Sequence, residues 1–320
     1  MTLATGRALR DVFGATLADL ADQDRRIVVL DGDVASSTGA EIFDTRHPDR
    51  FVQTGIGEQN LLGMAAGVAT VGLVPVISAF ACFAVGRAFD SIRVLIDQPA
   101  LSVKIAAGYT GLLTGMTGKT HQIFNDLAIM RTLPNMTVLA PADEVECRQA
   151  IMAMISTDGP FYIQITREVS PILFGGDYRF SIGRAVRLRD GSDVTLMSTG
   201  VQTTRVVEAA DVLAARGIQA TVLHVPTVKP LDADAIVGAA AASGFVVVVE
   251  EGSVLGGLGG AVAELLSDRY PVPVKRLGIQ DAYGESGPNA ALLDKYRLSP
   301  DALASDIRSL LTGRGVPAYA

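Results

Sequence analysis

The sequence predicts an α/β protein built from two doubly wound domains with mainly parallel sheets. Its 320 residues are enough for two ordinary domains. A composition of 49% hydrophobic and 19% charged residues excludes a disordered or fibrous chain. Short β-branched runs also alternate with longer helical patterns. Continuous apolar strands of this kind are typical of parallel sheets covered on both faces.

The predicted strands and helices follow one another in a regular βα order. The strands are expected at Arg26–Leu30, Val74–Ser78, Leu101–Ile105, Thr137–Leu139, Phe161–Ile165, Val194–Met197, Thr221–His224 and Phe245–Glu250. The helices are expected at Arg7–Leu20, Glu58–Thr70, Asp143–Ser156, Thr203–Arg216 and Leu255–Ser267. The most apolar stretch, Ala235–Val249, is shorter than the roughly 20 residues of a membrane-spanning helix. We therefore expect a buried helix running into a buried strand there.

One segment interrupts this alternation. Residues 171–192 are rich in turn residues and poor in helical pattern, and a new series of strands begins at Asp193. We therefore expect a first domain at residues 1–175, a linker at 176–190 and a second domain at 191–320.

Charge and composition exclude several classes of function. The net charge is −7 without a basic block, which argues against nucleic-acid binding. Two cysteines and three histidines cannot supply a disulfide framework, and they make a structural metal site improbable. The N-terminus lacks the apolar core of a signal peptide, so we expect a cytoplasmic protein. Of the histidines, His47 is expected on the solvated surface and His224 in the core.

The segment 55–72, GIGEQNLLGMAAGVATVG, places Glu58 where a Gly-rich turn enters a helix. A glutamate there is favoured by the helix dipole alone, but it could equally be a carboxylate that handles a proton. The small residues that follow allow another helix or a second subunit to pack closely.

Two further segments carry candidate site residues. Phe80 and Phe83, three residues apart, are either core aromatics or a platform for a flat heterocycle. Residues 106–136 begin with a loop rich in Gly and Thr that reaches His121, and such loops after strands are where α/β folds hold ligands. Arg7 and Arg167 are either ordinary surface arginines or anion ligands.

The order of these segments resembles the pyrimidine-binding and C-terminal domains of transketolase, and most closely the stand-alone C-terminal subunits of split transketolases. The resemblance rests on RFVQTGIGEQNLLGMAAGVAT, GKTHQIFNDLAIMRTLPNMTVLAPADEVE and VVVEEGSVLGGLGGAVAEL, and it covers nearly the whole chain. It implies a thiamine-diphosphate-dependent transferase that moves a two-carbon ketol or acyl unit from a ketose or 2-oxo donor to an acceptor.

The resemblance also assigns roles to residues. It implies that Glu58 exchanges a proton with the aminopyrimidine ring of the cofactor, and that Phe80, Phe83 and the motif residue Ile56 contact the cofactor. His121, in a Thr-His-Gln triplet shared with the family, would contact the substrate together with Tyr109. Arg7, Ser37 and Arg167 match positions that hold the sugar phosphate.

The diphosphate half of the expected site is missing from the sequence. The family holds Mg²⁺ and the diphosphate through a GDG…N motif, and this chain has no Gly-Asp-Gly triplet. The resemblance therefore implies a partner subunit that carries this motif, in an α₂β₂ assembly, with no metal ligand on this chain.

Three departures from the family pattern bear on the substrate. Met116 and Thr117 replace an acidic pair, Tyr109 replaces a histidine, and Gly252 follows Glu251 where the family has Glu-Glu-His. These changes remove partners for sugar hydroxyls, so we expect a donor or acceptor other than common pentose phosphates. The alternatives are a β-type subunit of a 2-oxo acid dehydrogenase, a fragment of 1-deoxyxylulose-5-phosphate synthase, or a non-catalytic scaffold subunit.

Overall fold

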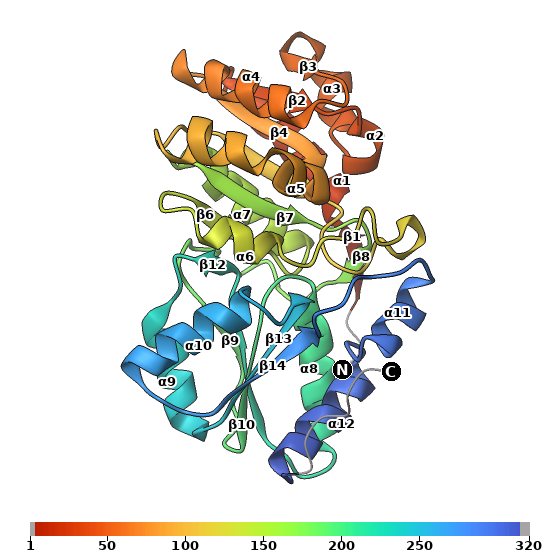
Figure 1. Ribbon diagram of the computed structural model, residues 1–320, viewed down its shortest axis with the longest axis vertical. Helices are drawn as coiled ribbons and strands as arrows, with labels where there is room; N and C mark the ends of the chain where they lie inside the picture. The colour runs from red at the N-terminus through yellow and green to blue at the C-terminus, as the bar shows by residue number, and fades with distance from the viewer. Residues whose placement is uncertain (1–3, 314–320) are drawn as a thin grey trace.

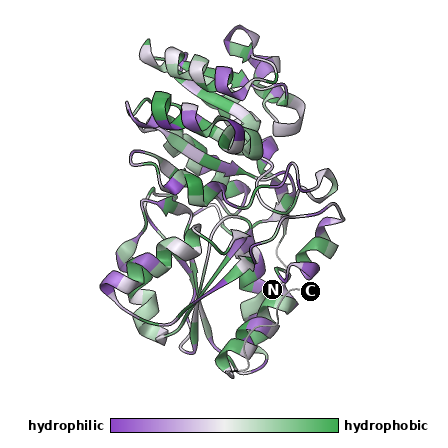
Figure 2. Ribbon diagram, viewed as in Figure 1, coloured by the Kyte–Doolittle hydropathy of each residue, from purple (hydrophilic) through white to green (hydrophobic). Residues whose placement is uncertain are grey.

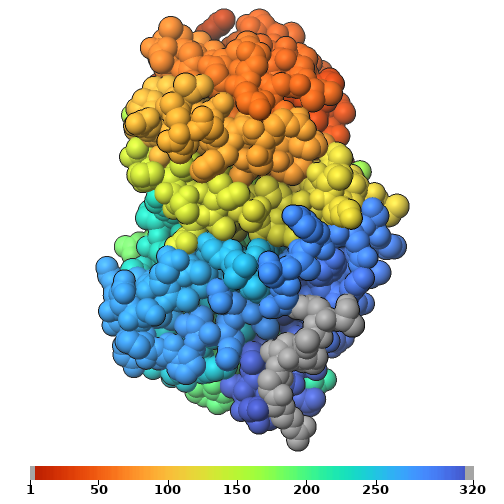
Figure 3. All heavy atoms as spheres, viewed as in Figure 1, coloured from red at the N-terminus to blue at the C-terminus, as the bar shows by residue number. Residues whose placement is uncertain are grey.

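The computed structural model describes residues 4–313, which form two α/β domains stacked along the long axis of the molecule (Figure 1). Figure 3 shows residues of the two domains packed directly against one another. Both domains have a mainly parallel sheet between two layers of helices, as the sequence predicts. The ends of the predicted domains, residues 1–3 and 314–320, lie outside the described residues.

The first domain is built on a seven-stranded sheet with the order β12-β6-β7-β5-β4-β2-β3. Every neighbouring pair in it is parallel except β12 and β6. Its strands are β2 (Ile27–Asp31), β3 (Phe51–Gln53), β4 (Val74–Phe80), β5 (Lys104–Gly108), β6 (Thr137–Leu139), β7 (Phe161–Ile165) and β12 (Thr227–Lys229).

Two helical layers bury the faces of this sheet in separate clusters of apolar side chains. One layer contains α1 (Leu9–Ala21), α2 (Ala35–Thr38), α3 (Glu41–Arg46) and α7 (Glu144–Ser156). The other contains α4 (Glu58–Thr70), α5 (Ala81–Ser91), the π-helical turn η2 (Ile92–Asp97) and α6 (Asp126–Arg131). Figure 2 shows the apolar residues alternating with polar ones along these helices.

The second domain has a five-stranded sheet with the order β14-β13-β10-β11-β9. Its strands are β9 (Val186–Arg189), β10 (Val194–Ser198), β11 (Ala220–His224), β13 (Val246–Ser253) and β14 (Val274–Ile279). Its helices are α8 (Gln202–Ala214), α9 (Ala233–Ser243), α10 (Leu258–Arg269), α11 (Asn289–Lys295) and α12 (Pro300–Leu311). The stretch Ala235–Val249 is a helix running into a strand, as expected, but only the strand β13 is largely buried. Helix α9 buries one face, with Ile236, Ala239 and Ala240, and exposes Gly238 and Ala241 on the other, so the expectation of a buried helix was wrong.

The division between the domains is less simple than the sequence suggests. Strand β9 lies inside the predicted linker and pairs antiparallel with β11 of the second sheet. Strand β12 follows β11 in the chain but pairs with β6 at the edge of the first sheet. The sequence analysis missed both exchanges, because β9 and β12 are edge strands of only four and three residues, and nothing local to such a short strand specifies the sheet with which it pairs.

Several predicted element ends differ from the structure by one to three residues. Arg7, placed in the first helix, lies instead in strand β1 (Thr5–Ala8), which pairs antiparallel with β8 (Val169–Pro171). Strand β5 spans Lys104–Gly108 rather than Leu101–Ile105. It continues past Ile105 because Ala106, Ala107 and Gly108 pair inside the buried sheet despite their low strand propensity. Helix α10 begins at Leu258, after Gly256 has taken a left-handed conformation.

Candidate active site

Glu58 is the first residue of α4, directly after the turn that follows β3. Its side chain is 3% exposed, whereas Ile56, two residues earlier, is 75% exposed. The N-terminal end of a helix stabilises a carboxylate, because unpaired N–H groups and the helix dipole point toward it. The structure therefore places a buried acidic group beside an open surface.

Arg87 of α5 is the ion-pair partner of Glu58, and the sequence analysis missed it. Its Nη1 donates to Glu58 Oε2 at 2.7 Å, and its guanidinium lies 4.5 Å from the centre of the Phe83 ring. Glu58 Oε1 accepts no hydrogen bond from the described residues, so it is available to a ligand. The signal was present, since residues four apart on one helix lie side by side and Arg87 follows Phe83 by four.

An aromatic cluster forms next to this pair. Phe80 and Phe83 lie 6.0 Å apart by ring centres, and the His121 ring meets both edge-on at 6.0 and 5.2 Å. The Tyr109 ring stacks on Phe80 at 4.0 Å. The fold thus brings together four residues that the sequence analysis singled out from two separate segments.

Two features of the Gly-rich loop fix the polar members of this cluster. Tyr109 has φ +61°, a conformation that is strained for a bulky residue and is found most often at functional sites. The Thr120 hydroxyl lies 2.9 Å from His121 Nδ1, which orients the imidazole ring. The Arg167 guanidinium lies 5.1 Å from the centre of the Tyr109 ring, so Arg167 reaches the edge of the cluster.

The other two expected anion ligands, Arg7 and Ser37, have partners of their own within the fold. The backbone N–H and Nε of Arg7 both donate to Glu144 Oε2, at 2.6 and 3.3 Å. The carbonyl of Ser37 accepts from Arg10 Nη1 at 3.2 Å. Among the described residues, no hydrogen bond or ion pair joins Arg7 or Ser37 to Arg167, and Arg10 is a cation beside Ser37 that the sequence analysis did not consider.

Asp31, in the Asp-Gly-Asp segment, serves the fold. It is buried, its Oδ1 accepts from Val34 N–H and Gln53 Nε2, and its Oδ2 accepts from the Ser78 hydroxyl. Within residues 4–313, His, Cys, Asp and Glu side chains form no group of three or more that could hold a metal ion. No helix in the same range is long and apolar enough to cross a membrane.

The remaining histidines differ in outcome. His224 is fully buried, as expected, with its ring nitrogens 2.8 Å from Thr203 Oγ1 and from Glu146 Oε2. The expectation for His47 was wrong, because its side chain is only 11% exposed. Its Nε2 lies 3.1 Å from the Ala18 carbonyl, and Arg50 Nη2 donates to its Nδ1.

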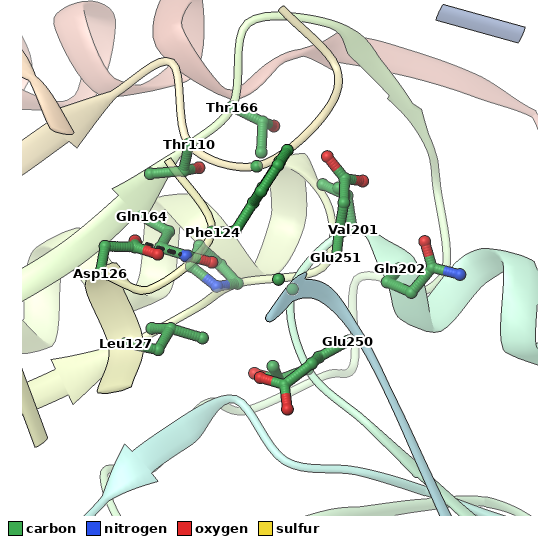
Figure 4. A pocket seen from close by; sticks show the side chains of 15 residues that line it. Thr110, Phe124, Asp126, Leu127, Gln164, Thr166, Val201, Gln202, Glu250 and Glu251 are labelled. Carbon is green, nitrogen blue, oxygen red and sulfur yellow. Dashed lines mark hydrogen bonds between the residues drawn. The ribbon is translucent and has the colours of Figure 1, made fainter. Parts of the chain in front are cut away.

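A small polar cavity lies where the domains meet (Figure 4). Its volume of about 20 Å³ has room for roughly one water molecule. Burial raises the pKa of Asp126, which accepts from Tyr162 and Gln164, and raises the pKa of Glu250 to about 7. Both carboxylates thus hold structural partners, and Glu250 accepts from the first N–H groups of α10.

Comparison with known families agrees with this fold. Residues 5–171 match the family model described as transketolase, pyrimidine binding domain, and residues 183–303 match transketolase, C-terminal domain. The chain therefore belongs to the transketolase family.

The relatives of this chain include separate C-terminal sections of transketolase. The chain is 38% identical to a putative transketolase C-terminal section of Methanocaldococcus jannaschii, over 94% of this chain and 95% of that one. It is also 38% identical to a 6-deoxy-6-sulfo-D-fructose transketolase subunit of a Clostridium species, over 91% and 90%. A solved structure described as a split gene transketolase, inactive beta4 tetramer, is 43% identical over 96% and 99%, with a TM-score of 0.87.

Proposed function

We propose that this chain is the pyrimidine-binding and C-terminal subunit of a split, thiamine-diphosphate-dependent transketolase. The observation that carries the proposal is the buried Glu58 carboxylate beside an aromatic cluster on a chain of the transketolase family. When bound, the cofactor would supply the carbon nucleophile for transfer of a two-carbon ketol unit between carbonyl compounds.

The residues present fit the pyrimidine half of that cofactor. Glu58 Oε1 would hold or move a proton at a ring nitrogen, while Arg87 keeps Oε2 in place. Phe83 and Phe80, with Ile56, would contact the ring and exclude water. Tyr109 and His121 would bind the oxygen atoms of the substrate, and Arg167 would bind its anionic end.

The diphosphate and Mg²⁺ would be held by a partner. The sequence of this chain has no Gly-Asp-Gly triplet, and its relatives include separate C-terminal sections of transketolase, which supports a second subunit with the GDG…N motif and an α₂β₂ assembly. Large apolar side chains are exposed on the turn before α4, on α4 itself and on η2, which packs against α4, as at a protein interface. These are Ile56, Met64, Val94 and Leu95. The related beta4 tetramer described as inactive agrees with a need for a partner.

We further propose that the substrate is not a common pentose phosphate. Tyr109 stands where a sugar-binding histidine is usual, and it stacks on Phe80 instead of presenting a second imidazole. Met116, which replaces an acidic residue, is 75% exposed. A related subunit is named for a sulfonated sugar, so variation of the substrate among such split enzymes supports this view.

The first experiment is affinity capture of the tagged chain from its native lysate with thiamine diphosphate and Mg²⁺. We expect to recover a partner with the GDG…N motif and cofactor held only by the pair. Ketol transfer is then screened with phosphorylated, sulfonated and neutral ketoses. Tight cofactor binding by the isolated chain would contradict the split-enzyme assignment, and acylation of a lipoyl carrier from a 2-oxo acid would identify a dehydrogenase subunit instead.

A further inference from the structure

Residues of the second domain form hydrogen bonds with the loop that carries Tyr109 and His121, the two residues proposed to bind the substrate. These hydrogen bonds are the grip of the second domain on the loop. Glu251 lies in β13, and its Oε1 accepts the N–H groups of Leu112 and Leu113 at 2.9 and 3.1 Å. Its Oε2 accepts from Arg205 Nη1 of α8 at 3.0 Å. The Glu251 side chain is 7% exposed, so this carboxylate is a buried charge whose partners come from both domains.

The loop packs tightly against Glu251. Gly111 has φ +74°, and a Cβ on it would lie 2.5 Å from Glu251 Oε1, so a residue larger than glycine would clash there. The next residue, Leu112, is fully buried in the apolar cluster of the second domain with Leu196 and Val249. The loop of the first domain thus inserts a side chain into the core of the second.

Asn289, at the start of α11, holds the same loop a few residues further on. Its Oδ1 accepts from Gly115 N–H at 2.9 Å, and its Nδ2 donates to the Leu113 carbonyl at 3.3 Å. Gln122, next to His121, donates from Nε2 to the Glu285 carbonyl at 3.2 Å. Contacts with the second domain therefore lie along the loop between Tyr109 and His121.

We propose that Glu251, with Asn289, is a positioning residue, and that the second domain acts on the reaction by fixing the loop that presents Tyr109 and His121 to the substrate. This inference rests on the proposed function only for its consequence in catalysis, because the grip itself is a property of the isolated chain. Positioning matters since a displacement of about 1 Å at a reacting group can lower a rate by 10²-fold.

Hydrogen exchange of the isolated chain, followed by mass spectrometry, tests the grip. In Glu251→Ala and Asn289→Ala we expect the amides of residues 111–115 to exchange at least about tenfold faster, because buried hydrogen bonds to a charged or amide oxygen are lost. Glu250→Ala is the matched control. Glu250 is also buried and accepts two backbone N–H groups, but those of Leu258 and Gly259 in its own domain. The variant Glu250→Ala should accelerate exchange of the amides at the start of α10 and leave the amides of residues 111–115 protected.

Two conservative variants distinguish the loss of the hydrogen bonds that hold the loop from the loss of the negative charge of Glu251. Glu251→Gln keeps an oxygen for Leu112 and Leu113 but leaves Arg205 facing an amide. Combining it with Arg205→Gln removes that conflict, so the double variant should regain protection of 111–115. Unchanged exchange of this segment in both alanine variants would overturn the proposal.

The reconstituted pair provides the catalytic readout. We expect Glu251→Gln to raise the KM for the donor by about tenfold and to leave the dissociation constant of the cofactor unchanged, since Glu58 and the phenylalanines stay in place. An unchanged KM despite faster exchange would overturn the positioning role. If the wild-type pair lacks ketol transfer, the proposed function fails, while the exchange data still decide whether the second domain grips the loop.

Discussion

The ion pair of Glu58 and Arg87 joins the two helices on which the proposed proton transfer depends. Glu58 begins α4, Arg87 lies within α5, and their 2.7 Å contact also seats the guanidinium on Phe83. An arginine suits this place because its planar fork can hold a carboxylate and lie on an aromatic face at once. A single side chain therefore orients both the acidic group and one wall of the site.

We expect Glu58→Gln to lower turnover of the reconstituted pair by at least about 10²-fold, because a positioned proton-transfer group is lost. Arg87→Ala should lower it roughly tenfold, and Arg87→Lys less, since an ammonium keeps the charge without the fork. Steady-state kinetics of each variant measure these losses of turnover. Because Arg87 acts through Glu58, the double variant should be no slower than Glu58→Gln alone. Fully additive losses would mean that Arg87 has a separate role.

Arg167 provides a second prediction for a single residue. It lies 5.1 Å from the Tyr109 ring, whereas Arg7 is tied to Glu144. If Arg167 binds the anionic end of the substrate, Arg167→Ala should raise the KM for a phosphorylated or sulfonated donor more than it lowers kcat. Arg7→Ala should change the KM less, because its guanidinium is committed to Glu144. An equal effect of both variants would indicate a wider anion site.

At the scale of elements, the central strand β5 carries a buried lysine. Lys104 is fully buried, and its Nζ donates to the carbonyls of Thr157 and Gly159 at 2.6 and 2.8 Å, which fixes the turn before β7. Burial lowers the pKa of this amine to about 7. Strand β5 is thus joined to β7 by backbone pairing, and the Lys104 side chain also bonds the turn that leads into β7.

This lowered pKa makes the stability of the chain depend on pH. Between about pH 7 and the ordinary lysine pKa near 10.5, the unfolded chain binds a proton that the folded chain does not. The free energy of unfolding should therefore rise with pH in this window, by up to about 1.4 kcal/mol per unit. Urea denaturation at pH 7.5 and 9 measures the slope, and Lys104→Met should remove this contribution. An equal slope in both proteins would show that the amine stays charged in the folded state.

At the scale of the whole molecule, a buried polar network joins the two domains. His224 of β11 lies 2.8 Å from Glu146 of α7, and Tyr178, in the segment between the domains, donates to the other Glu146 oxygen. Burial raises the pKa of Tyr178 above its ordinary value, so its hydroxyl remains a donor. This network adds to two other links between the domains, strand β12 in the first sheet and Leu112 in the second core.

We expect Glu146→Gln to lower the free energy of unfolding by roughly 2–4 kcal/mol, because buried partners are left without their charged acceptor. Arg148→Ala, in the same helix, is the control. Its ion pair with Asp19 is about half exposed and should contribute less than about 0.5 kcal/mol. Urea denaturation of each variant measures the difference. Similar losses in both would mean that the domains are held together mainly by apolar contacts.

Much of the fold and part of the site could be predicted from the sequence. The strands and helices follow from local runs of apolar residues, whose period is a property of neighbouring positions. The candidate residues Glu58, Phe80, Phe83 and His121 follow motifs that are continuous in the chain. The roles assigned to them remain predictions, since they rest on the resemblance and on the cofactor.

Other features depend on tertiary structure alone. The contact of Glu251 with Leu112 and Leu113 joins positions 139 and 138 residues apart, and strand β12 pairs across the domain boundary with β6. No local pattern encodes such pairs, because burial and hydrogen bonding are decided by whichever segments the packed chain brings together. The sequence by itself determined the two α/β domains, and it named most of the candidate site residues. Only the tertiary structure decided that the second domain holds the loop of the first, since that contact exists only when both cores have formed.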